Sequence, residues 1–363
     1  MKQLTFQEKI DLLRVIRTKN IGPISFFHLL DTYKNINKVI SMLETKINVM
    51  SKEEAMIEFN KIENFGAKLV AFCEPEYPVL LRKLRDAPPV ITVKGDISLL
   101  KKNIFSIAGS RSCSMHAQAL TKKIATELSD KHYVIAAGLA RGIDSVAHAY
   151  SLNKGTIAIL PNGIDQIYPS ENEELYSQIS KKGLLISETP FGSRPSSHLF
   201  LSRNRIIAGI SSGVLIAEAG LKSGSLTTAQ YALEYGREVF AIPGCPLDPR
   251  SRGTNNLIKH GANLVENTED ILNCLYHNRI QESVFEYNFN DDEPIALEKT
   301  TSIEKHKIDL LNLVGFFPVS IEFLSNKLDL SISLIRSLLV ELEIEGKITH
   351  TLGNKVIASV QNQ

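Results

Sequence analysis

A short stretch in the middle of the chain combines glycine, hydroxyl side chains and arginine, the residue types that bind phosphate groups. It contains Gly109, Ser110, Arg111, Ser112 and Ser114. Glycine lets a backbone approach an anion closely, free amides and hydroxyls donate hydrogen bonds, and arginine grips a phosphate through two parallel N–H groups. We interpret the stretch as an anion-binding loop. The alternative is a helix start capped by Ser114, with Arg111 in solvent.

Two further stretches have the same character. The second loop contains Gly138, Arg141 and Gly142. The third contains Ser223, Gly224 and Ser225 and lies at the start of an expected helix. The first two loops follow neighbouring strands, and two adjacent anion loops fit a polymer of phosphates better than a single mononucleotide.

A fourth segment concentrates two cations, an amide and an aromatic ring within six residues: Phe200, Arg203, Asn204 and Arg205. Arginine and asparagine contact phosphates and base edges, and phenylalanine offers a face on which an unpaired base stacks. This combination is typical of a site for single-stranded nucleic acid. The alternative is that Phe200 belongs to the core and the arginines form salt bridges at the sheet edge.

No set of residues in the sequence indicates catalysis. The chain has no Walker-type phosphate loop, no dinucleotide-binding glycine motif and no nucleophile elbow. Its four cysteines are scattered without a Cys-x-x-Cys pair, so we expect no zinc site, no disulfide framework, no metal and no cofactor. Asp144 is interpreted as a helix cap or a partner of a loop amide, and Glu218 as a ligand of a loop amide or a ribose hydroxyl. We expect a protein that is not an enzyme.

Strand-like and helical segments alternate between residues 103 and 266, which predicts a doubly wound, mostly parallel α/β sheet of the extended Rossmann-like type. Such a sheet binds ligands beyond the carboxyl ends of its strands, where the loops described above would lie. The apolar runs are Ile104–Ala108, Tyr133–Ala137, Thr156–Leu160, Leu184–Ser187, Val214–Ala217 and Val239–Ile242. The expected helices lie at about 118–129, 143–153, 171–181, 199–210 and 225–236.

The two ends of the chain differ from this centre, so we divide the chain into domains at 1–65, 66–277 and 303–363, with a linker at 278–302. Residues 1–65 show helical spacing interrupted at Ile21-Gly22-Pro23, as in a helix-hairpin-helix or SAM-like domain. Residues 303–363 predict three helices and a small hairpin, that is, a winged helix. Its third helix contains one arginine and three glutamates, which favours contact with protein over contact with DNA.

The net charge of +1 excludes a broadly basic, tail-driven DNA binder, and the mean hydropathy of −0.04 excludes a membrane bundle. The charge is unevenly spread: +4 on residues 66–277 is offset by −4 on the linker. Any nucleic acid would therefore bind to a local positive pocket. The sequence shows no signal peptide and no apolar segment of membrane-spanning length, and we expect a cytoplasmic protein.

Several multi-residue motifs in fixed order resemble the DNA-processing protein A family (DprA, also called Smf). They include IAGSRSCS, AGLARGIDSVAH, FLSRNRIIAGISS and EAGLKSGSLTTAQ, and the resemblance covers about residues 70–275. The three-part layout also resembles longer family members. Departures from the common pattern occur at Met115-His116, Ala137 and Leu201, where many relatives have Tyr-Gly, Ser and Pro.

The resemblance implies a homodimer that binds single-stranded DNA, protects incoming strands during natural transformation, loads the recombinase RecA on them and helps displace single-strand-binding protein. It places the main DNA pocket at Gly109, Ser110 and Arg111, with Arg141 and the segment Phe200–Arg205 beside it. It also makes Ile258, Lys259 and Leu264 candidates for a dimer or RecA interface. The rival hypotheses are a nucleotide or nucleoside hydrolase with Glu218 as its acid, and a pure protein adaptor.

Overall fold

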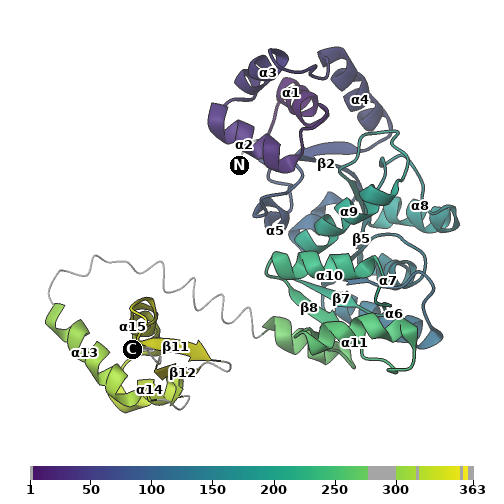
Figure 1. Cartoon of the computed structure of the whole chain (residues 1–363). Coiled ribbons are helices and arrows are strands. Elements are labelled where there is room, and N and C mark those ends of the chain that lie inside the picture. The colour runs from purple at the N-terminus through teal and green to yellow at the C-terminus, as the bar shows by residue number, and fades with distance from the viewer. Residues whose placement is uncertain (1–2, 277–299, 316–318, 352–354, 359–363) are drawn as a thin grey trace. The chain divides into compact units, whose positions relative to one another are not determined.

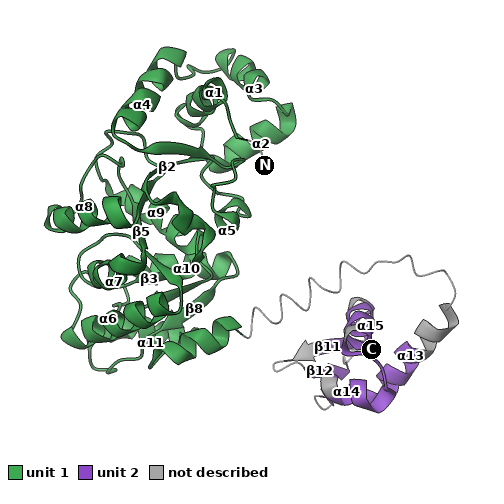
Figure 2. Ribbon diagram, turned by 180° about the vertical axis from the view of Figure 1, so that it is seen from behind, with its two compact units in different colours: residues 1–283 green, residues 284–363 purple. Residues whose placement is uncertain are grey.

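The computed structural model of the chain describes residues 3–276, 300–315, 319–351 and 355–358. These residues belong to two compact units, which span residues 1–283 and 284–363 (Figure 1, Figure 2). The linker expected at 278–302 lies outside the described residues up to residue 299. The remainder of that range is helical, because helix α13 already begins at Thr300.

Four helices form the N-terminal part of the first unit. Capping boxes fix the starts of the first and the fourth: Thr5 exchanges hydrogen bonds with Glu8, and Ser51 does the same with Glu54. Gly22 and Pro23 lie between the first two helices, as the sequence predicts, and Pro23 takes the first helical position of the second. The helices are α1 (Phe6–Ile16), α2 (Pro23–Tyr33), α3 (Ile36–Glu44) and α4 (Lys52–Asn64).

A nine-stranded sheet follows, in the order β1-β2-β6-β5-β4-β3-β7-β8-β9. All neighbours from β6 to β9 run parallel, while β1 and β2 pair antiparallel with each other and β2 pairs antiparallel with β6. The strands are β1 (Lys68–Ala71), β2 (Val90–Gly95), β3 (Asn103–Ala108), β4 (Tyr133–Ala137), β5 (Thr156–Leu160), β6 (Leu184–Ser187), β7 (Gly213–Ile216), β8 (Glu238–Ala241) and β9 (Asn263–Leu264).

Helices cover both faces of this sheet (Figure 1). Side chains of one strand alternate between the faces: Phe105 and Ile107 of β3 pack against α6 and α7, while Ile104 and Ala108 pack against α9 and α10. The helices are α5 (Val79–Arg82), η1 (Ile97–Lys101), α6 (Met115–Asp130), α7 (Ile143–Ser151), η2 (Leu152–Lys154), η3 (Ser170–Asn172), α8 (Glu173–Lys182), α9 (Ser197–Gly209), α10 (Ser225–Glu234), η4 (Pro249–Ser251) and α11 (Arg252–Lys259). Residues 268–276 are also helical.

The order of the strands reverses next to β3. From β3 the chain moves outward through β4 and β5 to β6, and α9 then carries it back to β7 on the other side of β3. This is the topological switch point at which doubly wound sheets open a crevice for ligands. The predicted Rossmann-like, doubly wound, mostly parallel sheet is confirmed. The sequence did not indicate β1, β2 or the two-residue β9.

The second unit is a winged helix with a core that includes Leu310, Leu324, Leu338 and Leu339. The predicted three helices and hairpin are confirmed, and a third strand of two residues, β10, joins the hairpin in the order β10-β12-β11. The elements are α13 (Thr300–Leu313), β10 (Val319–Ser320), α14 (Ile321–Leu328), α15 (Ile332–Ile344), β11 (Ile348–Thr351) and β12 (Lys355–Ala358). None of the helices in the described part of the chain has the length and apolar character needed to span a bilayer.

Candidate functional site

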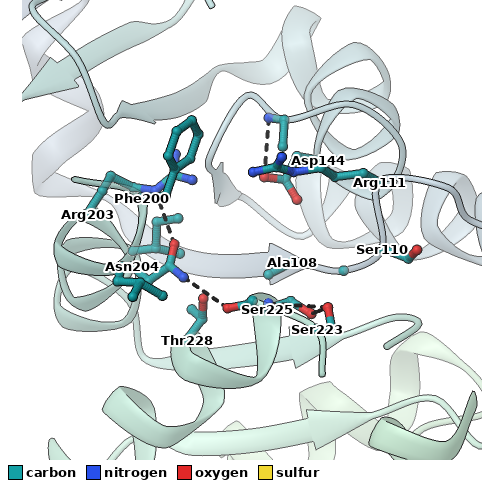
Figure 3. A pocket seen from close by; sticks show the side chains of 15 residues that line it. Ala108, Ser110, Arg111, Asp144, Phe200, Arg203, Asn204, Ser223, Ser225 and Thr228 are labelled. Carbon is teal, nitrogen blue, oxygen red and sulfur yellow. Dashed lines mark hydrogen bonds between the residues drawn. The ribbon is translucent and has the colours of Figure 1, made fainter. Parts of the chain in front are cut away.

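A pocket of about 360 Å³ opens at the switch point, beyond the carboxyl ends of β3, β4 and β7 (Figure 3). Three of the four predicted binding segments supply most of its lining: the β3–α6 loop, α9 and the β7–α10 loop. The β4–α7 loop contributes Ala140 to the wall. The pocket is lined by Ala108, Gly109, Ser110, Arg111, Ala140, Asp144, Phe200, Leu201, Arg203, Asn204, Ile207, Ser223, Gly224, Ser225 and Thr228.

Two glycines let the β3–α6 loop and the β4–α7 loop pack against each other. A Cβ atom on Gly109 would lie 2.6 Å from Cγ1 of Ile143, and one on Gly142 would lie 2.3 Å from the carbonyl oxygen of Ser110. Gly142 also has a φ of +77°, a conformation that L side chains rarely adopt. The amide of Ile143 donates to the Ser110 carbonyl at 3.2 Å, which joins the loops directly.

The serine side chains of the first loop form hydrogen bonds within the protein. The Ser114 side chain caps α6 by accepting from the amide of Ala117 at 3.1 Å, so the capping alternative is correct for this residue. The hydroxyl of Ser110 accepts from the amide of Ser112 at 3.2 Å and keeps its own proton available to a ligand. Arg111 is exposed, and its guanidinium carbon lies 5.2 Å from the centroid of the Phe200 ring.

Glu218 holds the first loop in place. Its carboxylate accepts from the amide of Ser114 at 3.1 Å, and its carbonyl oxygen accepts from the amide of Ser110 at 2.8 Å. The carboxylate is buried, so it is available neither to a ribose nor to a water in the pocket. The prediction that Glu218 holds a loop amide is confirmed, and this commitment removes the acid on which the hydrolase hypothesis depends.

Phe200 is not a core residue. It lies half-buried at the mouth of the pocket, between Arg111 and the ring of Tyr168, whose centroid is 5.4 Å from its own. Tyr168 is 37% exposed and belongs to the stretch that follows β5. Sequence reasoning missed Tyr168 as a site residue, although an aromatic residue after the carboxyl end of a predicted strand is the signal that would have identified it.

Arg203 has a structural role. Its side chain is 5% exposed, and its guanidinium donates to the carbonyl of Gly138 at 2.6 Å and to the carbonyl of Ile159. Gly138 leaves room for this contact, since a Cβ there would lie 2.4 Å from Nη1 of Arg203. Burial lowers the pKa of Arg203 to about 10, so it remains charged at neutral pH.

The side chains of Arg205 and Asn204 are also bound to other protein groups. Arg205 does not line the pocket: it forms a buried ion pair with Glu188 and donates to the carbonyl of Asp86 at 2.6 Å. Asn204 donates to the carbonyl of Gly224 at 3.1 Å and to Oγ1 of Thr227 at 2.7 Å. Both arginines lie on α9, which matches the helix expected at about 199–210.

The N-terminus of α10 faces the pocket. Gly224 is its N-cap residue and provides no side-chain cap, while the hydroxyls of Ser223 and Ser225 lie 2.8 Å apart. A helix N-terminus presents free amides and the positive end of the helix dipole. Here the amides of Ser225, Leu226 and Thr227 already donate within the turn, so this end of α10 contributes its positive dipole and the hydroxyls of Ser223 and Ser225. These hydroxyls line the same pocket as Ser110 and Arg111.

Asp144 lies at the base of the pocket and binds loop amides, as the sequence predicts. Its Oδ2 atom accepts from the amide of Gly138 at 3.0 Å and from that of Ala140 at 3.4 Å. Burial raises the pKa of Asp144, and the positive charge of Arg203 opposes that shift. His148, on the same helix, is fully buried with Nδ1 2.8 Å from the hydroxyl of Thr156, and burial lowers its pKa to about 3.

The remaining predicted residues lie farther out. Arg141 is exposed and forms an ion pair with Glu171 at 3.1 Å, beside a smaller hollow that also includes Tyr168 and Phe200. Ile258 and Lys259 lie near the end of α11, and Leu264 is 47% exposed on β9, the last strand of the sheet. Among the residues that the structure describes, no cluster of His, Cys, Asp and Glu could hold a metal ion.

The fold and the pocket define a class of protein: a Rossmann-like, doubly wound chain with a pocket of amides, hydroxyls and arginine at its switch point. Models of known protein families match the central sheet and also the helical domain and the winged helix at the two ends of the chain. The model for DNA recombination-mediator protein A matches residues 68–276, the DprA-like N-terminal HHH domain matches 6–59, and the DprA winged helix domain matches 298–354. The chain belongs to the DNA recombination-mediator protein A (DprA/Smf) family.

Individual relatives support this membership. The DNA processing protein DprA of Streptococcus pneumoniae is 42% identical over 217 residues, which cover 59% of this chain and 75% of that one. The Bacillus subtilis DprA is 39% identical over 219 residues, covering 60% and 74%. The X-ray structure of the S. pneumoniae protein matches with a TM-score of 0.64 and 32% identity, over 75% of this chain and 98% of that chain.

A solved structure of DNA processing protein A from Helicobacter pylori is also similar. It matches with a TM-score of 0.54 and 32% identity, over 58% of this chain and 96% of that chain, and it was described for its single-stranded DNA binding mode.

Proposed function

We propose that this protein binds single-stranded DNA at the switch-point pocket and mediates loading of a RecA-type recombinase onto that DNA during DNA uptake. The observation that carries the proposal is the exposed Arg111 beside the Phe200 ring, at the edge of the pocket onto which the N-terminus of α10 opens. Cations bind the backbone of a DNA strand, and rings stack on its unpaired bases. The H. pylori relative, which binds single-stranded DNA, supports this ligand.

Each part of the site has a distinct role in this proposal. Arg111 binds a phosphate, and the positive end of the α10 dipole together with the hydroxyls of Ser110, Ser223 and Ser225 stabilises the same phosphate or the next one. Phe200 and Tyr168 stack on the bases. Arg203 and Asn204 hold the neighbouring loops in position and do not grip the strand, because their side chains are already bound to protein groups.

Arg141 is a second cation for the strand. Its ion pair with Glu171 is more than half exposed on both sides, and such pairs contribute little to stability, so a phosphate can replace the carboxylate at small cost. Arg141 lies on the same side of the pocket as Tyr168, which gives the strand a path from the start of α10 past Phe200 to Arg141.

Single-strand binding alone does not load a recombinase, so the proposal includes protein surfaces. Leu264 is 47% exposed on β9, the last strand in the described sheet, and Ile258 lies on α11, the helix that precedes β9; we assign this surface to a homodimer or RecA contact. Displacement of single-strand-binding protein and a cytoplasmic location belong to the same proposal.

The winged helix suits a protein partner better than a DNA backbone. Glu341 and Glu343 on α15 are exposed, and Glu341 and Glu345 bind Lys307 at 2.6 and 3.2 Å, which reduces the cations available to phosphate. Ile332 and Val340 on the same helix are 43% and 50% exposed.

Titration of labelled single-stranded and duplex oligonucleotides of equal length, followed by anisotropy, tests the binding half of the proposal. Preference for the single strand supports it, and equal or absent binding contradicts it. RecA filament formation on a strand coated with single-strand-binding protein tests the loading half. The expected result is faster filament formation with this protein than without it, and an unchanged rate contradicts loading.

A further inference from the structure

A second cavity, of about 620 Å³, lies at the edge of the sheet opposite the switch-point pocket. Its walls come from the end of η1, the end of α6, the starts of β3 and β4, and η2. We call it the amino-edge cavity, because the parallel strands begin there. β3 has six residues, so the length of the strand separates the two cavities by roughly 20 Å.

The amino-edge cavity is positively charged. Lys101, Lys102 and Lys154 line it together with His132, and no aspartate or glutamate does. Lys154 has one acidic neighbour, Asp130 at 3.6 Å, and both side chains are about 60% exposed, so that pair is weak. Lys101 and Lys102 are exposed and have no ion pair within the described part of the chain.

Stabilisation of helix ends does not explain this arrangement. A lysine in the last turn of a helix interacts favourably with the negative end of that helix dipole, which accounts for one lysine at each helix end. Here the lysines come from two separate short helices and converge on one cavity, where the amides of Asn103 and Asn153 join them. Convergent cations and amides without a carboxylate are the features of an anion site.

We infer that the amino-edge cavity is a second binding site for the phosphate backbone of single-stranded DNA. Lysine ammonium groups act as point charges that neutralise phosphates without reading sequence, and the side-chain amides donate to phosphate or sugar oxygens. The described lining has two rings: Tyr133 is only 8% exposed, and the smaller imidazole of His132 is exposed. The site therefore differs from the switch-point pocket: it binds the backbone mainly through the charges of three lysines and depends more steeply on salt.

The inference rests on the proposed function, since it adds a second DNA site to the same protein. The following experiment distinguishes failure of the amino-edge site from failure of the switch-point site. A short oligonucleotide, dT6, is titrated at low salt onto the full chain, and the number bound per protomer is measured by calorimetry. The unchanged protein is expected to bind two. The double substitution Lys101→Gln with Lys102→Gln is expected to leave one, and Arg111→Ala is expected to leave one, at the amino edge. Lys52→Gln with Lys61→Gln on α4, which removes the same charge from another exposed surface, is expected to leave two.

The residual binding of the Arg111→Ala protein isolates the new site. With three lysines in contact with phosphates, the logarithm of its affinity is expected to fall with a slope of about −2 against the logarithm of salt concentration. One oligonucleotide per unchanged protomer, or two on the Lys101/Lys102 variant, overturns the inference. Tighter binding of hexaglutamate than of dT6 to the Arg111→Ala protein also overturns it, because the site would then belong to an acidic peptide. If the lysine substitutions remove one oligonucleotide while Arg111→Ala removes none, the amino-edge site stands and the switch-point proposal fails.

Discussion

The guanidinium of Arg111 lies 5.2 Å from the centroid of the Phe200 ring, although the two residues come from the β3–α6 loop and from α9. This contact places a cation and a stacking surface at one edge of the pocket. A strand bound there would meet a charge for its phosphate and a ring for its base within a single nucleotide.

Substitution of the two rings tests base stacking. Phe200→Ala and Tyr168→Ala are each expected to weaken binding of oligo-dT by about 1–3 kcal/mol, the usual contribution of an aromatic ring that stacks on a base. Both rings are partly exposed, so the melting temperature should change little.

An oligonucleotide without bases is the matched control for the rings. The unchanged protein should lose affinity for it, while the Phe200→Ala protein should bind it about as well as the unchanged protein does. A Phe200→Ala protein that prefers oligo-dT as strongly as the unchanged protein would show that the ring does not stack.

Arg203 is predicted to matter for stability rather than for contact with DNA. Arg203→Met leaves the carbonyls of Gly138 and Ile159 without their donor and removes the charge that offsets Asp144, so the free energy of unfolding should fall by roughly 3–5 kcal/mol. Chemical denaturation measures the change.

Arg194→Met is the matched control for Arg203→Met, because Arg194 is exposed. It should leave the unfolding midpoint unchanged. An Arg203→Met protein of unchanged stability that has lost only DNA binding would contradict the structural role. It would indicate that Arg203 contacts the DNA.

The buried His148 predicts a specific loss of stability in acid. Burial lowers its pKa to about 3 from 6.5, so between these values the unfolded chain binds a proton that the folded chain does not. This contribution is fully present above pH 6.5 and is lost as the pH falls, by up to about 1.4 kcal/mol per pH unit. Denaturation of the unchanged and the His148→Gln proteins from pH 7.5 to 4.5 measures it: the variant should have the shallower dependence.

His28 provides the comparison for this pH dependence because it is exposed on α2. His28→Gln should reproduce the dependence of the unchanged protein. If His148→Gln and His28→Gln give the same slope, His148 does not remain neutral in the folded protein.

The sequence predicted the parts of this fold that depend on periodicity. Each buried run from Ile104 to Ile242 became a strand of the parallel sheet, since continuous apolar runs between helices indicate strands covered on both faces. Short strands at the edges, such as β9 and β10, lack such a pattern, because two residues pair only where the fold brings a neighbour to them.

Residue type alone does not predict which side chains of the site can reach a ligand. Arg111 and Arg203 are equally plausible phosphate ligands in the sequence, but only burial separates them: Arg203 is 5% exposed and bound to two carbonyls. Gly138 is the clue that sequence reasoning lacked, since its missing side chain makes room for that guanidinium. Tyr168 was missed because its role depends on its contact with Phe200, 32 residues later in the sequence.

Removal of the winged helix locates single-strand binding. A chain that ends at Ser283 retains the whole first compact unit and should bind a single-stranded oligonucleotide with nearly the affinity of the full chain. Anisotropy on both proteins, with duplex DNA as the comparison, measures this. A large loss of single-strand affinity in the shortened chain would place the principal DNA site in the second unit.

The salt dependence of single-strand binding to the Arg111→Ala protein is the sharpest test of DNA binding at the switch-point pocket. Each lost phosphate contact should reduce the slope of log affinity against log salt by about 0.7, and affinity itself should fall markedly at physiological salt. Arg85→Ala, which removes an exposed arginine outside the pocket, should change neither quantity. Affinity and slope of Arg111→Ala that match those of the unchanged protein would contradict DNA binding at the switch-point pocket.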